Sequence, residues 1–85
     1  MQDKINEEIR EMIAGYIDVN ASELSMDADL DIEYDMDSTE MTEFAKKVEQ
    51  KYGISIQRSE RQDWVSGRDI CKFVARKLAD SAVTA

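Results

Sequence analysis

The apolar residues near the start of the chain recur at intervals of three and four positions. They are Ile5, Ile9, Met12, Ile13, Tyr16 and Ile17. Side chains spaced in this way lie along one side of an α-helix, which a globular protein packs against its core. The pattern predicts an amphipathic helix over residues 3–17, with Asp3 as its N-cap.

Residues 18–37 follow no sustained period. Leu24, Leu30 and Ile32 stand as isolated apolar anchors in polar, acidic sequence. A connection of this length without helix or strand is uncommon in a small domain, and it usually has a function or packs as an ordered loop. We expect a long first loop that does both.

The next helix is predicted to begin after Asp37. Asp37 and Glu40 have the spacing of a capping box, which makes Ser38 the first helical residue. Gly53 follows at the position where many helices end in the left-handed conformation. The buried stripe consists of Met41, Phe44, Ala45, Val48 and Tyr52. The opposite face, which we expect to point to solvent, carries Thr39, Thr42, Glu43 and Lys46.

The segment after Gly53 predicts a short extended piece and then a brief helix. Ile54 and Ile56 alternate with polar residues, and Ser59 with Gln62 has the spacing to cap a helical turn that ends near Trp64.

A last long helix is capped by Ser66 and Asp69. Its apolar stripe is Ile70, Phe73, Val74 and Leu78. These elements predict one all-α domain over residues 1–80, with a frayed tail at residues 81–85. The expected architecture is a four-helix bundle of three main helices and one short helix, with a long first loop.

Negative charge is concentrated in one part of the 85-residue chain. The net charge is −8, and residues 27–40 (DADLDIEYDMDSTE) contain seven acidic residues and no basic one, so the remainder sums to −1. Crowded carboxylates repel one another, and a merely solvated loop would leave most of them without a role. The pattern favours basic protein partners and disfavours nucleic acid or an anionic membrane.

The composition removes several classes of chemistry. The chain has no histidine, so Ser38 lacks the usual base of a serine nucleophile, and we expect no catalytic residue. Cys71 is the single cysteine, which excludes an internal disulfide and a multi-thiolate metal site. We interpret Cys71 as a packing residue or a free thiol. Without an 18-residue apolar run or a signal-peptide pattern, we expect a cytoplasmic monomer with no membrane insertion.

A calcium loop is the alternative that the acidic segment leaves open. In a register that starts at Asp29, the ligand positions fall on acidic side chains, but Tyr34 occupies the position where the sharp turn calls for glycine. Residues 19–28 also lack the stripe of an entering helix, and a register from Asp27 fits less well. A calcium-binding or purely structural acidic interaction module using residues 27–40 is therefore the second hypothesis.

The order of these elements resembles an acyl or peptidyl carrier protein. The resemblance rests on DMDSTEMTEFAKKVEQKYGISI, residues 35–56, and WVSGRDICKFV, residues 64–74. Asp37-Ser38 matches the Asp-Ser pair of the family motif and Tyr52-Gly53-Ile54 resembles its helix end. Glu43, Phe44 and Val48 also match the family pattern. The resemblance covers nearly the whole chain and implies a four-helix bundle.

The resemblance further implies that Ser38 is an attachment point for covalent 4′-phosphopantetheine from coenzyme A, with Asp37 flanking the site. The arm would carry acyl or aminoacyl groups as thioesters in fatty-acid, polyketide or nonribosomal-type biosynthesis. Implied partners are a phosphopantetheinyl transferase, an acyl- or aminoacyl-loading enzyme, and synthase or transferase enzymes with basic docking patches. The expected partner face comprises Thr39, Glu40, Thr42, Glu43 and Lys46, with Asp31, Glu33 and Asp35 adding long-range attraction.

Some positions depart from the family pattern. Asp35 stands where glycine is usual, Thr39 replaces the leucine after the serine, and Lys46 is basic where the family is often apolar or acidic. Trp64-Val65-Ser66 resembles the Trp-x-Thr step of D-alanyl carriers and of discrete carriers of unusual extender units. Together these features favour a discrete carrier in a specialised pathway.

Overall fold

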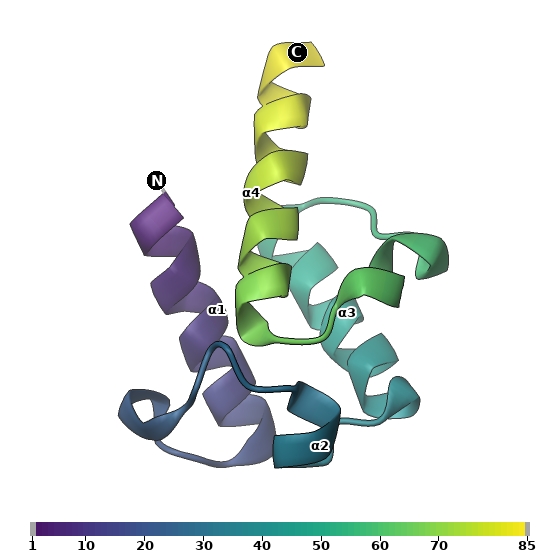
Figure 1. Ribbon diagram of the computed structural model, residues 1–85. Helices are drawn as coiled ribbons and strands as arrows, with labels where there is room; N and C mark the ends of the chain where they lie inside the picture. Colours follow the sequence, from purple (N-terminus) through teal and green to yellow (C-terminus); the bar gives the residue numbers. More distant parts are fainter. Residues whose placement is uncertain (1, 85) are drawn as a thin grey trace.

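Three long helices form the frame of the molecule (Figure 1). The computed structural model describes residues 2–84, and within that range it contains helices and connections but no strand. The long helices are α1 (Gln2–Ile17), α3 (Ser38–Tyr52) and α4 (Gly67–Thr84). The short elements are α2 (Leu30–Tyr34) and the 3₁₀ helices η1 (Ala21–Glu23) and η2 (Arg58–Asp63). The predicted all-α fold class is confirmed.

The core forms where the apolar stripes of the long helices meet. The long helices and the segment before α4 contribute Ile5, Ile9, Ile13, Phe44, Val48, Trp64, Ile70, Phe73 and Val74, and the first connection contributes Leu24, Leu30 and Met36. Two edge-to-face aromatic pairs lie in this core. Tyr16 of α1 contacts Phe44 of α3, with 5.8 Å between the ring centroids, and Trp64 contacts Phe73 of α4, with 5.4 Å between the centroids. The predicted stripes therefore face the core, and the stripe residues that are only half-buried are Met12, Tyr16, Ile17, Met41, Tyr52 and Leu78.

A polar contact ties α1 to the far end of α3. The Tyr52 hydroxyl donates a hydrogen bond to Glu8 Oε1 at 2.9 Å, and Lys51 Nζ lies 3.7 Å from Glu8 Oε2. Burial, together with the neighbouring Glu8 carboxylate, raises the pKa of the Tyr52 phenol well above its ordinary value. The phenol therefore stays protonated and remains a donor.

The first connection is more regular than expected. Asp29 caps α2, because its Oδ1 accepts from the N–H groups of Asp31 and Ile32 at 2.9 and 3.0 Å. The Leu30 N–H donates to the Val65 carbonyl at 2.8 Å, which fixes α2 beside the start of α4. The prediction that Ile32 anchors this connection to the core is wrong, since 76% of its surface is exposed.

Arg10 holds the earlier part of this connection. Its Nη1 donates to the carbonyls of Ala21 and Leu24 at 2.8 and 2.7 Å, so the guanidinium satisfies backbone oxygens around η1. Buried Leu24 packs into the core beside them. The connection is therefore anchored from α1.

Two of the predicted helix starts need correction. Asp3 lies inside the first turn of α1 and is not its N-cap. The brief helix begins at Arg58, and its capping box is formed by Gln57 and Glu60, not by Ser59 and Gln62. Glu60 makes two contacts. Its Oε1 accepts a hydrogen bond from the Gln57 N–H at 2.8 Å, and its Oε2 forms a salt bridge with Lys77 of α4 at 3.0 Å.

The other helix ends agree with the sequence pattern. Ser66 and Asp69 exchange hydrogen bonds at the start of α4, at 3.0 and 3.3 Å. Gly53 ends α3 in the left-handed region with φ of 64°. The backbone of α4 continues to Thr84; fraying at residues 81–85 and the boundary at residue 80 stay predictions, and Ala85 lies outside the described residues.

Candidate functional site

Ser38 lies at a sharp junction between two helices. Asp35 ends α2 in the left-handed conformation, with φ of 57°, and α3 begins three residues later. Asp37 caps α3, since its Oδ1 accepts from the Glu40 N–H at 3.0 Å. The second half of the predicted capping box is wrong, because the Asp37 N–H donates to the Asp35 carbonyl instead. This arrangement leaves the side chain of Ser38 exposed at the first residue of α3.

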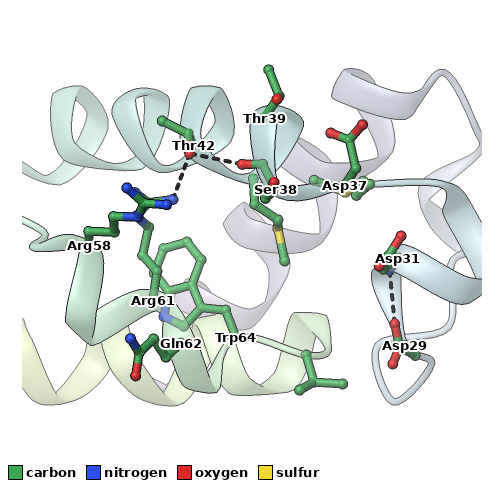
Figure 2. Close-up of a pocket in the computed structure, with 13 residues that line it drawn as sticks. Asp29, Asp31, Asp37, Ser38, Thr39, Thr42, Arg58, Arg61, Gln62 and Trp64 are labelled. Carbon is green, nitrogen blue, oxygen red and sulfur yellow. Dashed lines mark hydrogen bonds between the residues drawn. The ribbon is translucent and has the colours of Figure 1, made fainter.

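An open groove of about 780 Å³ runs past Ser38, between α3 and η2 at one end and beside α2 at the other (Figure 2). One end carries the carboxylates of Asp29, Asp31 and Asp37, and the other end carries Arg58 and Arg61. The apolar part of the lining is provided by Met36, Met41, Trp64 and Val65, and the polar part also includes Thr39, Thr42 and Gln62. The groove is thus negatively charged at one end and positively charged at the other.

Thr42 links the arginine end of the groove to Ser38. Its hydroxyl donates to the Ser38 carbonyl at 2.8 Å and accepts from Arg61 Nη1 at 3.0 Å. The expectation that Thr42 points to solvent is therefore wrong: its side chain is half-buried and lines the groove. Two consecutive hydrogen bonds, which share the Thr42 hydroxyl, therefore connect the guanidinium of Arg61 to the backbone of Ser38.

Trp64 presents an unsatisfied donor in this region. The side chain is 6% exposed, and its buried Nε1 forms no hydrogen bond with any part of the chain that the structure describes. A buried donor without an acceptor costs about 1–3 kcal/mol. The indole both packs against Phe73, as a core aromatic would, and lines the groove.

Besides Asp37, two more of the crowded carboxylates have structural roles. Asp27 forms a two-fold ion pair with Arg68 of α4, and this neighbour holds the pKa of the Asp27 carboxyl below its ordinary value. Asp29 caps α2, as described above. The fold thus explains part of the concentration of acidic residues; the cap formed by Asp37 was predicted from the sequence, whereas the roles of Asp27 and Asp29 were not.

The other acidic and polar residues of the predicted partner face are mostly exposed. Exposed side chains are those of Asp31, Glu33, Asp35, Thr39, Glu43 and Lys46, while Glu40 and Thr42 are half-buried. Their role in binding partners stays a prediction. Exposed Ile32 lies among Asp31 and Glu33 on α2, so the acidic surface also contains an apolar side chain.

The geometry disfavours the calcium loop. A loop from Asp29 to Glu40 would have to wrap one ion, whereas α2 and the first turn of α3 occupy that segment. No group of three or more acidic, histidine or cysteine side chains within residues 2–84 is arranged to hold a metal ion.

Cys71 is a buried packing residue with a protonated thiol. Burial raises the pKa of its thiol to about 11. Since the thiolate is the reactive form, iodoacetamide at pH 8 should alkylate Cys71 far more slowly in the folded protein than in the urea-unfolded chain, where the pKa returns to about 8.5. Mass spectrometry of timed samples measures both rates. Equal rates would contradict the burial of this side chain.

The N-cap of α3 offers a second test. Replacing Asp37 with alanine should lower the free energy of unfolding by about 1 kcal/mol, because the Glu40 N–H loses its acceptor. Urea unfolding followed by circular dichroism measures the change. Asp37→Asn is the matched control, since its amide oxygen can accept the same bond and it should stay close to the wild type. An equal loss in both variants would assign the effect to charge and not to the cap.

Comparisons with known proteins agree with this layout. A family model described as "Phosphopantetheine attachment site" matches residues 7–74. The "Polyketide-8 synthase acyl carrier protein 2" of Streptomyces avermitilis is 28% identical over 75 residues, which cover 88% of this chain and 86% of that protein. Among the described residues, no helix is both long and apolar enough to cross a bilayer.

Proposed function

Because the chain belongs to the phosphopantetheine attachment-site family, whose domain carries 4′-phosphopantetheine covalently, we propose that Ser38 is the attachment residue and that the protein is a discrete acyl carrier. The observation that carries this proposal is the exposed hydroxyl of Ser38 at the first residue of α3, on the rim of the groove. Asp37, through its cap bond, fixes the turn that presents this hydroxyl.

The surroundings of Ser38 fit a phosphodiester. By helix geometry, the N–H groups of Ser38 and Thr39 have no intrahelical acceptor, and the helix dipole favours negative charge at this end. The groove gives a flexible arm a place to lie next to the attachment point. When bound, the arm would supply a thiol on which cargo is held as a thioester.

The chain's own part in this function is to bind and present, and we assign it no catalytic residue. It has no histidine to act as a base, and its Cys71 is buried and protonated. Activation and transfer of the cargo therefore belong to partner enzymes.

The cargo we propose is an acyl or aminoacyl group of a specialised pathway. The name of the Streptomyces avermitilis relative places that protein with a polyketide synthase, which favours polyketide-type biosynthesis over fatty-acid or nonribosomal-type biosynthesis here. The partners would be a phosphopantetheinyl transferase, a loading enzyme, and synthase or transferase enzymes with basic patches. These would dock on the exposed acidic surface that includes Asp31, Glu33, Asp35 and Glu43. A cytoplasmic location stays a prediction.

Intact-mass measurement tests the proposal. The protein is incubated with coenzyme A, magnesium and a broad-specificity phosphopantetheinyl transferase, and a parallel sample omits the transferase. We expect one phosphopantetheine-sized mass gain, which fragmentation assigns to Ser38 and not to the adjacent hydroxyl of Thr39. A folded sample that gains nothing, with a transferase shown to be active on another carrier, would contradict the proposed function.

A further inference from the structure

Two arginines stand out in the groove of this acidic protein. Arg58 and Arg61 both line it, and neither forms a salt bridge with a carboxylate of residues 2–84. Asp29, Asp31 and Asp37 line the opposite end of the same groove and do not reach them (Figure 2). In a chain with a net charge of −8, a pair of guanidiniums without a carboxylate partner is available for an external anion.

Arg61 is also positioned before any anion arrives. Its Nη1 is fixed by the Thr42 hydroxyl at 3.0 Å, and the Thr42 hydroxyl is fixed by the Ser38 carbonyl at 2.8 Å. The remaining N–H groups of the guanidinium are left for a ligand, which a phosphate or carboxylate can contact with two oxygens. Because the relay ends at the Ser38 carbonyl and both residues line the same groove, an anion held by Arg61 lies in the groove that the proposed attachment residue also lines.

We propose that the groove between α3 and η2 binds the base of the phosphopantetheine arm, with Arg61 as the ligand of the phosphodiester and Arg58 as a second cationic contact. The inference rests on the proposed attachment at Ser38. A phosphodiester on the Ser38 hydroxyl is repelled by the carboxylates at one end of the groove and attracted by the guanidiniums at the other, so the arm leaves Ser38 toward η2.

Trp64 supplies an independent observation in the same place. Its buried Nε1 has no acceptor within residues 2–84, although the side chain lines the groove. The arm contains amide carbonyls, which are the acceptors that an indole N–H requires. In the proposed complex, a small movement of neighbouring side chains exposes the Trp64 Nε1–H to the groove. It then donates a hydrogen bond to one of these amide carbonyls.

A carboxylate on the cargo is the other anion that Arg58 and Arg61 could hold. The cargo is attached at the far end of the arm, whereas Arg61 lies two hydrogen bonds from the Ser38 backbone. The short path to Ser38 favours the phosphodiester. The two sources are separable, because the unloaded arm contains the phosphodiester and no carboxylate.

The test compares apo, unloaded holo and cargo-loaded forms of the full chain by nuclear magnetic resonance. The single tryptophan gives one indole N–H signal, and the arginine Nε–H signals report on the guanidiniums. Variants are Arg61→Gln, Arg61→Lys and, as a matched control, Lys47→Gln, which removes one exposed positive charge from α3 outside the groove. Intact mass first verifies that every holo sample is modified, so that loss of attachment is recognised separately.

In the wild type we expect conversion from apo to unloaded holo to shift the indole and Arg61 signals. Arg61→Gln should lose most of the indole shift, Arg61→Lys should recover only part of it, and Lys47→Gln should retain it. Signals that stay unchanged in a fully modified holo protein would overturn the inference while leaving the carrier function intact. A shift that appears only when the cargo bears a carboxylate would also overturn it, since the anion would then be the cargo.

Discussion

Replacing Ser38 with alanine is expected to abolish the mass gain from coenzyme A completely, while the free energy of unfolding stays within about 0.5 kcal/mol of the wild-type value. The loss is total because the substitution removes the one oxygen to which we assign the arm. Stability is preserved because the bonds at this turn use the Ser38 carbonyl and the Asp37 side chain, neither of which the substitution removes. Intact mass and urea unfolding measure the two effects.

Ser55→Ala is the matched control for this experiment. Ser55 is an exposed serine in the connection after α3, it does not line the groove, and its removal should leave the mass gain unchanged. A folded Ser38→Ala protein that still gained one phosphopantetheine would show that another hydroxyl is used. The assignment of the whole site would then fail.

The largest effect on stability is expected from Phe44→Ala. Phe44 is fully buried in α3 and packs edge-to-face against Tyr16 of α1. Removing a buried phenyl ring costs about 3–5 kcal/mol, because apolar surface is lost from the core and a cavity remains. Since small domains are stable by only about 5–15 kcal/mol, the variant should lose a large share of its stability. Urea unfolding at equilibrium measures this change.

Ile32→Ala is the control that separates burial from hydrophobicity. Ile32 is also a large apolar residue on a helix, but 76% of its surface is exposed, so the change should stay within about 0.5 kcal/mol. Similar losses in the two variants would mean that Ile32 is packed, and they would contradict the arrangement of α2 described here.

The sequence predicted the long helices well because each presents several turns of apolar stripe and recognisable caps. The short helix α2 was missed, since its five residues give no period to detect. Asp29 at the N-cap position and the four-residue spacing from Leu30 to Tyr34 were the available signals. The exposure of Ile32 could not be foreseen, because one apolar residue in an irregular segment does not reveal which side faces the core.

The candidate site was predictable only where it depends on local sequence. The cap of Asp37 and the placement of Ser38 follow from neighbouring residues. The groove requires η2 to lie against α3, and this depends on how distant parts of the chain pack. Arg58 and Arg61 are about twenty positions from Ser38 in the sequence, so their proximity to it could not be inferred from spacing. The inward position of Thr42 was missed for the same reason.

The burial of Cys71 protects the chemistry that we propose for this protein. A thioester can pass its acyl group to any thiolate that meets it, and a reactive cysteine on the carrier itself would capture the cargo in a dead-end bond. Cys71 is the chain's single cysteine, it is almost completely buried, and its pKa of about 11 keeps it protonated at neutral pH. With this thiol buried and protonated, the chain would offer the proposed thioester cargo no reactive cysteine of its own to which the acyl group could be lost.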